Sequence, residues 1–162
     1  MFDVSKLVIE GQSRLQGDLT IHGAKNSVLP ILSAALLGRG ESVIHNCPGL
    51  SDVDASVKIL EYLGCRVTRT GSDLTVNTDG VYRSDIPDHL MREMRSSIVF
   101  LGAIASKMGR AKLSFPGGCE LGPRPIDLHL KSLRRMGLQI DEDHGCLDCR
   151  CMGRLHGANI AL

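Results

Sequence analysis

The chain has 162 residues, of which 43% are hydrophobic and 23% are charged, and its formal net charge is +1. These values are typical of a globular domain with its own core, and they provide neither the positive field nor the aromatic surface that nucleic-acid binding needs. No stretch has the length and apolarity of a membrane span, and the N-terminus lacks a signal pattern. We therefore expect a cytoplasmic protein whose six cysteines are thiols.

The first part of the chain predicts a β-α-β-α-β-β order. Alternating polar and apolar residues predict strands, longer apolar runs predict helices, and Gly or Pro marks their ends. In chain order, the predicted elements are a strand at Asp18–His22, a helix over Val28–Leu37 with Pro30 in its first turn, a strand at Ser42–Asn46, a helix capped by Ser51 or Asp52 and ended by Gly64, and a hairpin of Arg66–Arg69 and Leu74–Asn77.

A second unit of the same kind follows. Its predicted elements are a long helix over Met91–Met108, a strand at Ala111–Phe115, a helix opened by Pro125 and ended by Gly137, and a hairpin of Leu138–Glu142 and Cys146–Cys151. Leu60–Val67 aligns with Leu133–Ile140 about 73 residues later, because both segments are a helix end, a glycine and an emerging strand. The predicted fold class is α/β (α+β), with repeated units over about 18–80 and 81–152.

The last residues predict the beginning of a third unit. Leu155–Leu162 is expected to form its first strand. A repeat unit reduced to one strand leaves its neighbour's apolar surface uncovered, so the chain is expected to be an incomplete domain.

Two loops carry residues suited to chemistry. In Gly23-Ala24-Lys25-Asn26, a helix N-terminus and a lysine together favour an anion, although the same pattern is often a turn with a solvated lysine. The loop Phe115–Pro125 holds three glycines and three prolines, which leave Cys119 sterically open and place Arg124 at a helix start. Its alternative interpretation is a flexible surface loop with an incidental thiol.

Two further features have competing interpretations. Arg95 is a candidate ligand contact, although an arginine within a helix is more often solvated or paired with a residue one turn away. Cys146, Cys149 and Cys151 have a spacing seen in metal sites, but strand alternation places Cys149 and Cys151 on one face and Cys146 on the other. We therefore predict no metal and no cofactor, and a metal-binding module stays an alternative.

Four motifs resemble one family along the whole chain. Thr20–Pro30, Met94–Ser97, Pro116–Cys119 and Gly122–His129 resemble the enolpyruvyl transferases that act on UDP-N-acetylglucosamine. The resemblance implies two domains, each built from three β-α-β-α-β-β units around a pseudo-threefold axis. It also implies transfer of the enolpyruvyl group from phosphoenolpyruvate to the 3-hydroxyl of UDP-N-acetylglucosamine with release of phosphate, the first committed step of peptidoglycan synthesis.

The resemblance also implies roles for nine residues. Cys119 would protonate the methylene carbon, form a covalent adduct with phosphoenolpyruvate and react with fosfomycin. The expected phosphoenolpyruvate-binding residues are Lys25 and Asn26, the latter facing the sugar, and the expected UDP-N-acetylglucosamine-binding residues are Arg95, Arg124, Pro125, Ile126, Asp127 and Leu128.

The chain departs from the family in a few places. His22 replaces a small residue, His156 replaces a lysine, and members of the family are more than twice as long. Residues 1–17 are expected to belong with a second, C-terminal domain, which is missing here and would supply a catalytic aspartate and an arginine. The alternatives are an inactive remnant that binds phosphate or a UDP-sugar, and a transferase of the shikimate type.

Overall fold

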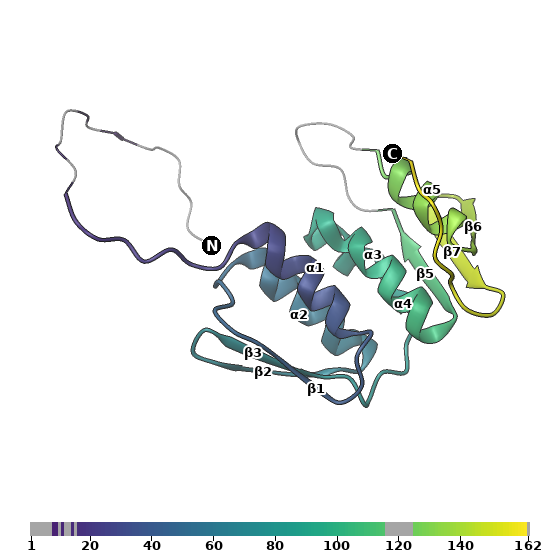
Figure 1. Ribbon diagram of the computed structural model, residues 1–162, viewed down its shortest axis with the longest axis horizontal. Coiled ribbons are helices and arrows are strands. Elements are labelled where there is room, and N and C mark those ends of the chain that lie inside the picture. The colour runs from purple at the N-terminus through teal and green to yellow at the C-terminus, as the bar shows by residue number, and fades with distance from the viewer. Residues whose placement is uncertain (1–7, 10, 12–13, 15, 116–124, 162) are drawn as a thin grey trace.

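The first sheet and its two helices come from residues 25–77. The computed structural model of the chain describes residues 8–9, 11, 14, 16–115 and 125–161. The elements of this part are α1 (Lys25–Ala35), β1 (Glu41–Ile44), α2 (Ser51–Leu63), β2 (Arg66–Thr70) and β3 (Asp73–Asn77). The three strands are antiparallel in the order β1-β3-β2, and α1 and α2 lie side by side over one face of this sheet (Figure 1).

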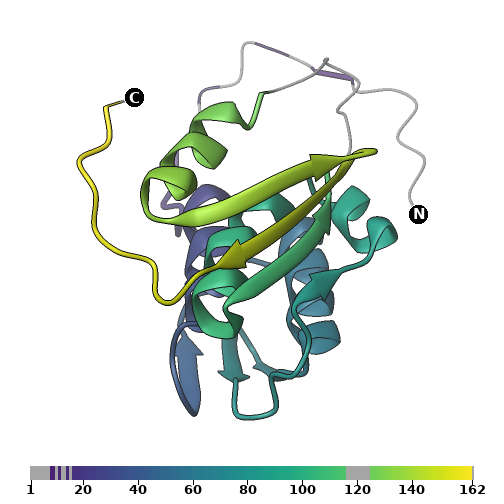
Figure 2. The same ribbon diagram turned by 90° about the vertical axis from the view of Figure 1, so that its right-hand side faces the viewer.

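The second sheet has four strands and comes from residues 85–151. Its elements are β4 (Asp85–Ile86), α3 (Asp88–Glu93), the 3₁₀ helix η1 (Arg95–Val99), α4 (Phe100–Met108), β5 (Arg110–Ser114), α5 (Asp127–Arg135), β6 (Leu138–Asp143) and β7 (Cys146–Cys151). The order is β4-β5-β7-β6, in which only the pairing of β4 with β5 is parallel. Figure 2 faces this sheet, with α4 behind it.

The two units end alike, as the sequence repeat predicts. In each, a helix stops at a glycine with positive φ and an antiparallel hairpin follows: Gly64 (φ 106°) precedes β2, and Gly137 (φ 97°) precedes β6. Both glycines allow the sharp change of direction that a residue with a Cβ atom makes only at a cost. The predicted mixed α/β class and both predicted hairpins are confirmed.

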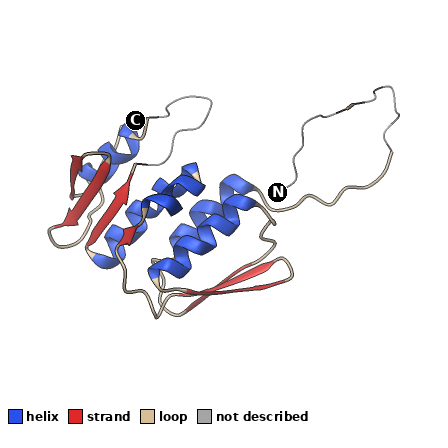
Figure 3. Cartoon of the chain, turned by 180° about the vertical axis from the view of Figure 1, so that it is seen from behind, coloured by secondary structure: helices blue, strands red, loops and turns tan. Residues whose placement is uncertain are grey.

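Two predicted strands are wrong. Asp18–His22 has no strand conformation and extends away from the packed elements before α1 (Figure 3), with Leu19 83% and Ile21 75% exposed. Residues 154–161 also lack strand conformation, although the His156 N–H donates to the Met136 carbonyl at 3.0 Å. Alternation alone does not make a strand, because a strand needs a neighbour for its ladder hydrogen bonds, and neither segment has one among the described residues.

The predicted helix boundaries need four corrections, one of which is that α5 begins at Asp127 and not at Pro125. The helix expected over Met91–Met108 is interrupted at Met94, whose backbone is extended (φ −142°, ψ 126°). The N-cap of α2 is Leu50, so neither Ser51 nor Asp52 caps it. Because α1 begins at Lys25, Pro30 lies in its second turn, where it removes the N–H that the Asn26 carbonyl would accept.

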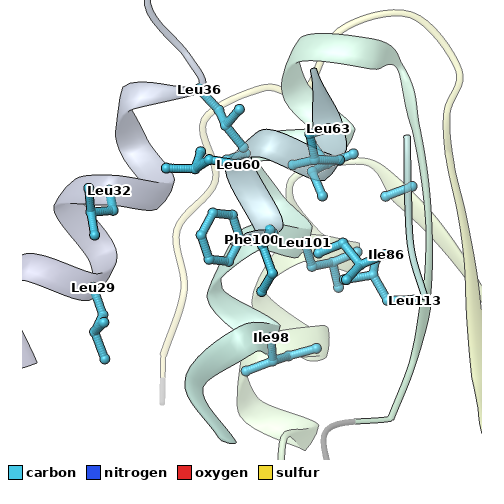
Figure 4. Packing of buried hydrophobic residues seen from close by; sticks show 14 of the residues in the cluster. Leu29, Leu32, Leu36, Leu60, Leu63, Ile86, Ile98, Phe100, Leu101 and Leu113 are labelled. Carbon is cyan, nitrogen blue, oxygen red and sulfur yellow. The ribbon is translucent and has the colours of Figure 1, made fainter. Parts of the chain in front are cut away.

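The core lies where the helices of the two units meet. Leu32 of α1, Leu36 directly after that helix, Leu60 of α2, and Phe100 and Leu101 of α4 are each at most 1% exposed (Figure 4). Burying a side chain of this size contributes roughly 1.5–3 kcal/mol relative to leaving it in water. One continuous cluster of buried residues spans both units, so the ends of their helices are held in fixed positions relative to each other.

None of the helices in the described part of the chain is long and apolar enough to cross a membrane.

Candidate functional site

A cavity of about 810 Å³ opens where the first turns of α1 and α2 approach the interruption between α3 and η1 and the start of α5. Its walls therefore combine both units. The lining residues are Lys25, Asn26, Leu29, Pro30, Asp52, Glu93, Met94, Arg95, Ser96, Ile98, Val99, Pro125, Ile126, Leu128 and His129.

Lys25 is the first residue of α1. The first N–H groups of a helix have no acceptor within the helix, and the helix dipole adds partial positive charge there. The first turn of α1 carries no acidic residue. Instead, the Asp52 carboxylate of α2 lies 2.9 Å from the Lys25 ammonium. An ammonium has three donors, so Lys25 keeps two for a ligand while it stays bound to Asp52.

Asp52 lines the cavity, although the sequence did not predict it as a site residue. It was expected at most as a cap of its own helix, because nothing in the local pattern shows that the start of α2 faces the start of α1. Its side chain is 27% exposed, against 53% for Lys25, so the pair lies at the cavity wall.

Arg95 reaches the cavity from the second unit. It is the first residue of η1, directly after the extended Met94, and it is partly buried. The neighbouring acid Glu93 pairs with Lys58 of α2 at 2.8 Å. The described lining residues carry positive charges on Lys25 and Arg95 and negative charges on Asp52 and Glu93. Such a wall suits a ligand that carries both anionic groups and hydroxyl groups.

The segment at the start of α5 closes another side of the cavity. Pro125, Ile126 and Leu128 line it, whereas Asp127, the first residue of α5, is exposed and is not among the lining residues described. Cys119 and Arg124, the other two residues predicted for the site, lie outside the described residues.

His129 is a second lining residue to which the sequence assigned no role. Burial lowers its pKa, and a hydrogen bond to the Ile98 backbone opposes that shift only in part. Its Nε2 atom is buried and has no hydrogen-bond partner among the described residues. A lowered pKa keeps the imidazole neutral at pH 7, so His129 adds no positive charge to the cavity.

The described cysteines lie away from the cavity lining. Burial raises the pKa of Cys65 and of Cys149 to about 11, which keeps both thiols protonated and unreactive. Cys149 is buried on the inner face of β7, and Cys146 lies on the opposite face, as the alternation predicts. In the described ranges, no three His, Cys, Asp or Glu side chains are grouped so as to hold a metal ion.

Comparison with known proteins relates this fold to one class of enzyme. The family model described as EPSP synthase (3-phosphoshikimate 1-carboxyvinyltransferase) matches residues 9–162. The crystal structure of the enolpyruvyl transferase NikO from Streptomyces tendae superposes with a TM-score of 0.75 at 25% identity, covering 90% of this chain and 32% of that one. The chain therefore belongs to the EPSP synthase family of enolpyruvyl transferases.

Within that family, the chain is similar to curated relatives that share one name. UDP-N-acetylglucosamine 1-carboxyvinyltransferase 2 of Caldanaerobacter subterraneus subsp. tengcongensis is 50% identical over 159 residues, which is 98% of this chain and 38% of the relative. The UDP-N-acetylglucosamine 1-carboxyvinyltransferase of Serratia proteamaculans is 40% identical over the same shares of the two chains. The chain thus spans about two fifths of the length of these relatives, which are enzymes.

Proposed function

We propose that this chain forms part of an enzyme that transfers the enolpyruvyl group from phosphoenolpyruvate to the 3-hydroxyl of UDP-N-acetylglucosamine, with release of phosphate, at the first committed step of peptidoglycan synthesis. The observation that carries the proposal is the meeting of Lys25 and Arg95, from two different units, on the wall of one cavity. The names of the curated relatives support the choice of the UDP-sugar over shikimate 3-phosphate.

In this proposal Lys25 and Asn26 bind phosphoenolpyruvate. The ammonium and the start of α1 offset the charge of its phosphate, while Asp52 holds the ammonium from the opposite side at 2.9 Å. Arg95 binds the UDP-sugar, together with Arg124 and the segment Pro125–Leu128. Arginine suits this role because its planar donors bind two phosphate oxygens at once.

Cys119 is the proposed proton donor. Replacing phosphate by an alkoxy group at C2 of phosphoenolpyruvate requires addition followed by elimination. In the addition, the sugar oxygen bonds to C2 and loses its proton, and the C3 methylene gains a proton from the protonated thiol. In the elimination, C3 returns a proton and the bond from C2 to the phosphate oxygen breaks, which restores the double bond and releases inorganic phosphate. The same thiol is the proposed site of fosfomycin attack.

We propose that this chain supplies only part of the active site, and that the other part lies in a protein as long as the curated relatives. The chain covers 38% of the relatives, so we propose that a second domain faces this cavity and contributes an aspartate and a further arginine. The segment 1–17 is proposed to pack with that domain.

The direct test is phosphate release from phosphoenolpyruvate, measured with UDP-N-acetylglucosamine or shikimate 3-phosphate in the 162-residue chain and in a protein of the relatives' length. We expect release in the longer protein with the UDP-sugar only, and none from its Cys119→Ala variant. Release with shikimate 3-phosphate alone would instead favour the shikimate-type reaction. Full activity in the Cys119→Ala variant would overturn the role of that thiol.

Ligand binding tests the role of Lys25 directly. We expect Lys25→Ala to weaken phosphoenolpyruvate binding at least about tenfold, by loss of a charged hydrogen bond, and to change UDP-sugar affinity much less. Lys131→Ala is the matched control, because Lys131 is exposed on α5 and its ammonium contacts the Ala161 carbonyl at 3.2 Å. Equal losses for the two ligands in Lys25→Ala would contradict the assignment.

A further inference from the structure

The interruption between α3 and η1 determines where Arg95 lies. In an uninterrupted helix, Arg95 would follow Met91 by four residues, which places both on one face. Met91 is fully buried, so that face is the one turned to the core. A continuous helix would therefore direct a guanidinium group toward apolar side chains. The extended Met94 changes the direction of the chain, and Arg95 lines the cavity instead.

Ser97 replaces the hydrogen bond that the interruption removes. In a continuous helix the Met91 carbonyl would accept from the Arg95 N–H, four residues on. In the structure the Ser97 hydroxyl donates to this carbonyl at 3.0 Å, and Ser97 is fully buried. A buried carbonyl without a donor is destabilising, and the Ser97 hydroxyl supplies the donor that the interrupted backbone lacks.

A second contact holds the interruption from the side of α2. The Met94 side chain is 2% exposed, and its sulfur lies 3.4 Å from the hydroxyl of the fully buried Ser56. The Ser97 N–H also donates to the Met94 carbonyl at 3.2 Å, which closes the first turn of η1. The extended residue is thus fixed by its own side chain and by the turn that follows it.

We propose that Ser97 is a positioning residue for Arg95: its hydroxyl keeps the helix interrupted at Met94, and the interruption holds the Arg95 guanidinium at the cavity. The identity of the ligand, a UDP-sugar whose diphosphate Arg95 binds, rests on the proposed function. The positioning itself concerns the backbone and does not depend on which anion binds. Ser97 touches no substrate in this proposal and acts through Arg95 alone.

The test is a double-mutant cycle on affinity for UDP-N-acetylglucosamine, measured by calorimetry with the 162-residue chain. We expect Ser97→Ala and Arg95→Ala each to weaken binding about tenfold, and the double variant to bind no more weakly than Arg95→Ala alone. A merely structural role would give independent losses of about a hundredfold in the double variant, which would overturn the proposal.

Ser33→Ala is the matched control. Ser33 is 4% exposed, and its hydroxyl donates at 3.0 Å to the Val99 carbonyl at the end of η1, so this variant also removes a buried bond to the same segment. We expect its effect on affinity, whatever its size, to be independent of Arg95. Where Ser97→Ala fails to fold, Ser97→Cys takes its place, because the thiol has a similar volume and is a weaker donor.

A second readout separates this proposal from the proposed function. Carbon chemical shifts of Met94 report extended or helical backbone without any ligand. We expect extended values in the parent chain and a shift toward helical values in the Ser97 variant. If the parent chain binds no UDP-sugar but the shift occurs, the assignment of the UDP-sugar as a ligand of this chain by itself fails and the positioning role stands. If the UDP-sugar binds and Met94 stays extended in the variant with unchanged affinity, the positioning role is wrong.

Discussion

The two units of this chain follow one plan and differ in their first strand. In the second unit, β4 precedes the helices and pairs in parallel with β5, the strand that follows them. In the first unit, the segment before α1 has a clearer strand pattern than β4, yet Asp18–His22 pairs with no strand among the described residues, which form a sheet of three strands. The difference shows that residue alternation selects the face a strand would bury, whereas a neighbouring edge decides whether the strand forms.

The largest difference in stability between matched variants of the two units is expected at Gly64 and Gly137, the glycines that follow α2 and α5. A Cβ atom at Gly64 would overlap the Gly80 carbonyl oxygen and lie 2.6 Å from the Tyr82 ring, whereas at Gly137 the nearest atom is the His156 ring nitrogen at 3.1 Å. Alanine with positive φ costs about 1–2 kcal/mol by itself. We expect Gly137→Ala to lose about that much and Gly64→Ala at least about 4 kcal/mol, measured by urea unfolding. Equal losses would show that the two glycines have equivalent surroundings.

A smaller difference in stability is expected two residues earlier, at Tyr62 and its counterpart Arg135. The Tyr62 hydroxyl donates to the Asp85 carboxylate at 2.8 Å and accepts from Arg83 at 3.1 Å, and the Arg83 guanidinium lies 4.5 Å above the Tyr62 ring. These contacts join α2 to the chain that enters the second unit. We expect Tyr62→Phe to reduce the free energy of unfolding by about 1–2 kcal/mol. Arg135 is exposed, so Arg135→Ala should change it by less than about 0.5 kcal/mol.

The third difference concerns how the stability of each unit depends on pH. Burial lowers the pKa of His129 in the folded chain, so unfolding takes up a proton below the ordinary histidine pKa near 6.5. The neutral, buried His129 therefore costs no stability above that pH, and the free energy of unfolding decreases as the pH falls through it. The counterpart in α2 is Ser56, which does not titrate. We expect His129→Gln to weaken the loss of stability between about pH 7.5 and 5.5, and Ser56→Ala to leave it unchanged. Identical pH profiles for the parent chain and His129→Gln would contradict this assignment.

The smallest difference in stability is expected between variants at the turns of the two hairpins. In the first unit, a hydrogen bond from His45 at 2.7 Å lowers the pKa of Asp73, which also accepts from the Asn46 N–H. A lowered carboxyl pKa adds stability that is present above the ordinary aspartate pKa and is lost as the pH falls through the lowered value. We expect Asp73→Asn to remove this slight acid dependence. In the second unit, Asp143 and His144 are each more than 80% exposed, so Asp143→Asn should change stability less than Asp73→Asn does.

Much of the fold follows from residues near one another in the chain. The glycines after Leu63 and Met136, the alternation in both hairpins and the apolar face of α2 were each sufficient to place an element, because turn geometry and burial act over a few residues. The same holds for part of the site. Lys25 and Arg95 stood out as charged residues near helix starts or in recognisable motifs, although their roles in binding remain predictions.

The amino-acid sequence was enough to identify the family, the two repeated units and two of the charged residues that face one cavity, Lys25 and Arg95. Tertiary packing decided the rest: the unpaired Asp18–His22, the interruption at Met94, and the approach of Asp52 to Lys25 within 2.9 Å. Each of these depends on a partner distant in the chain, a strand edge, a buried hydroxyl or a second helix start. Local patterns carry no information about such partners, because contacts at long separation are set by how the elements pack.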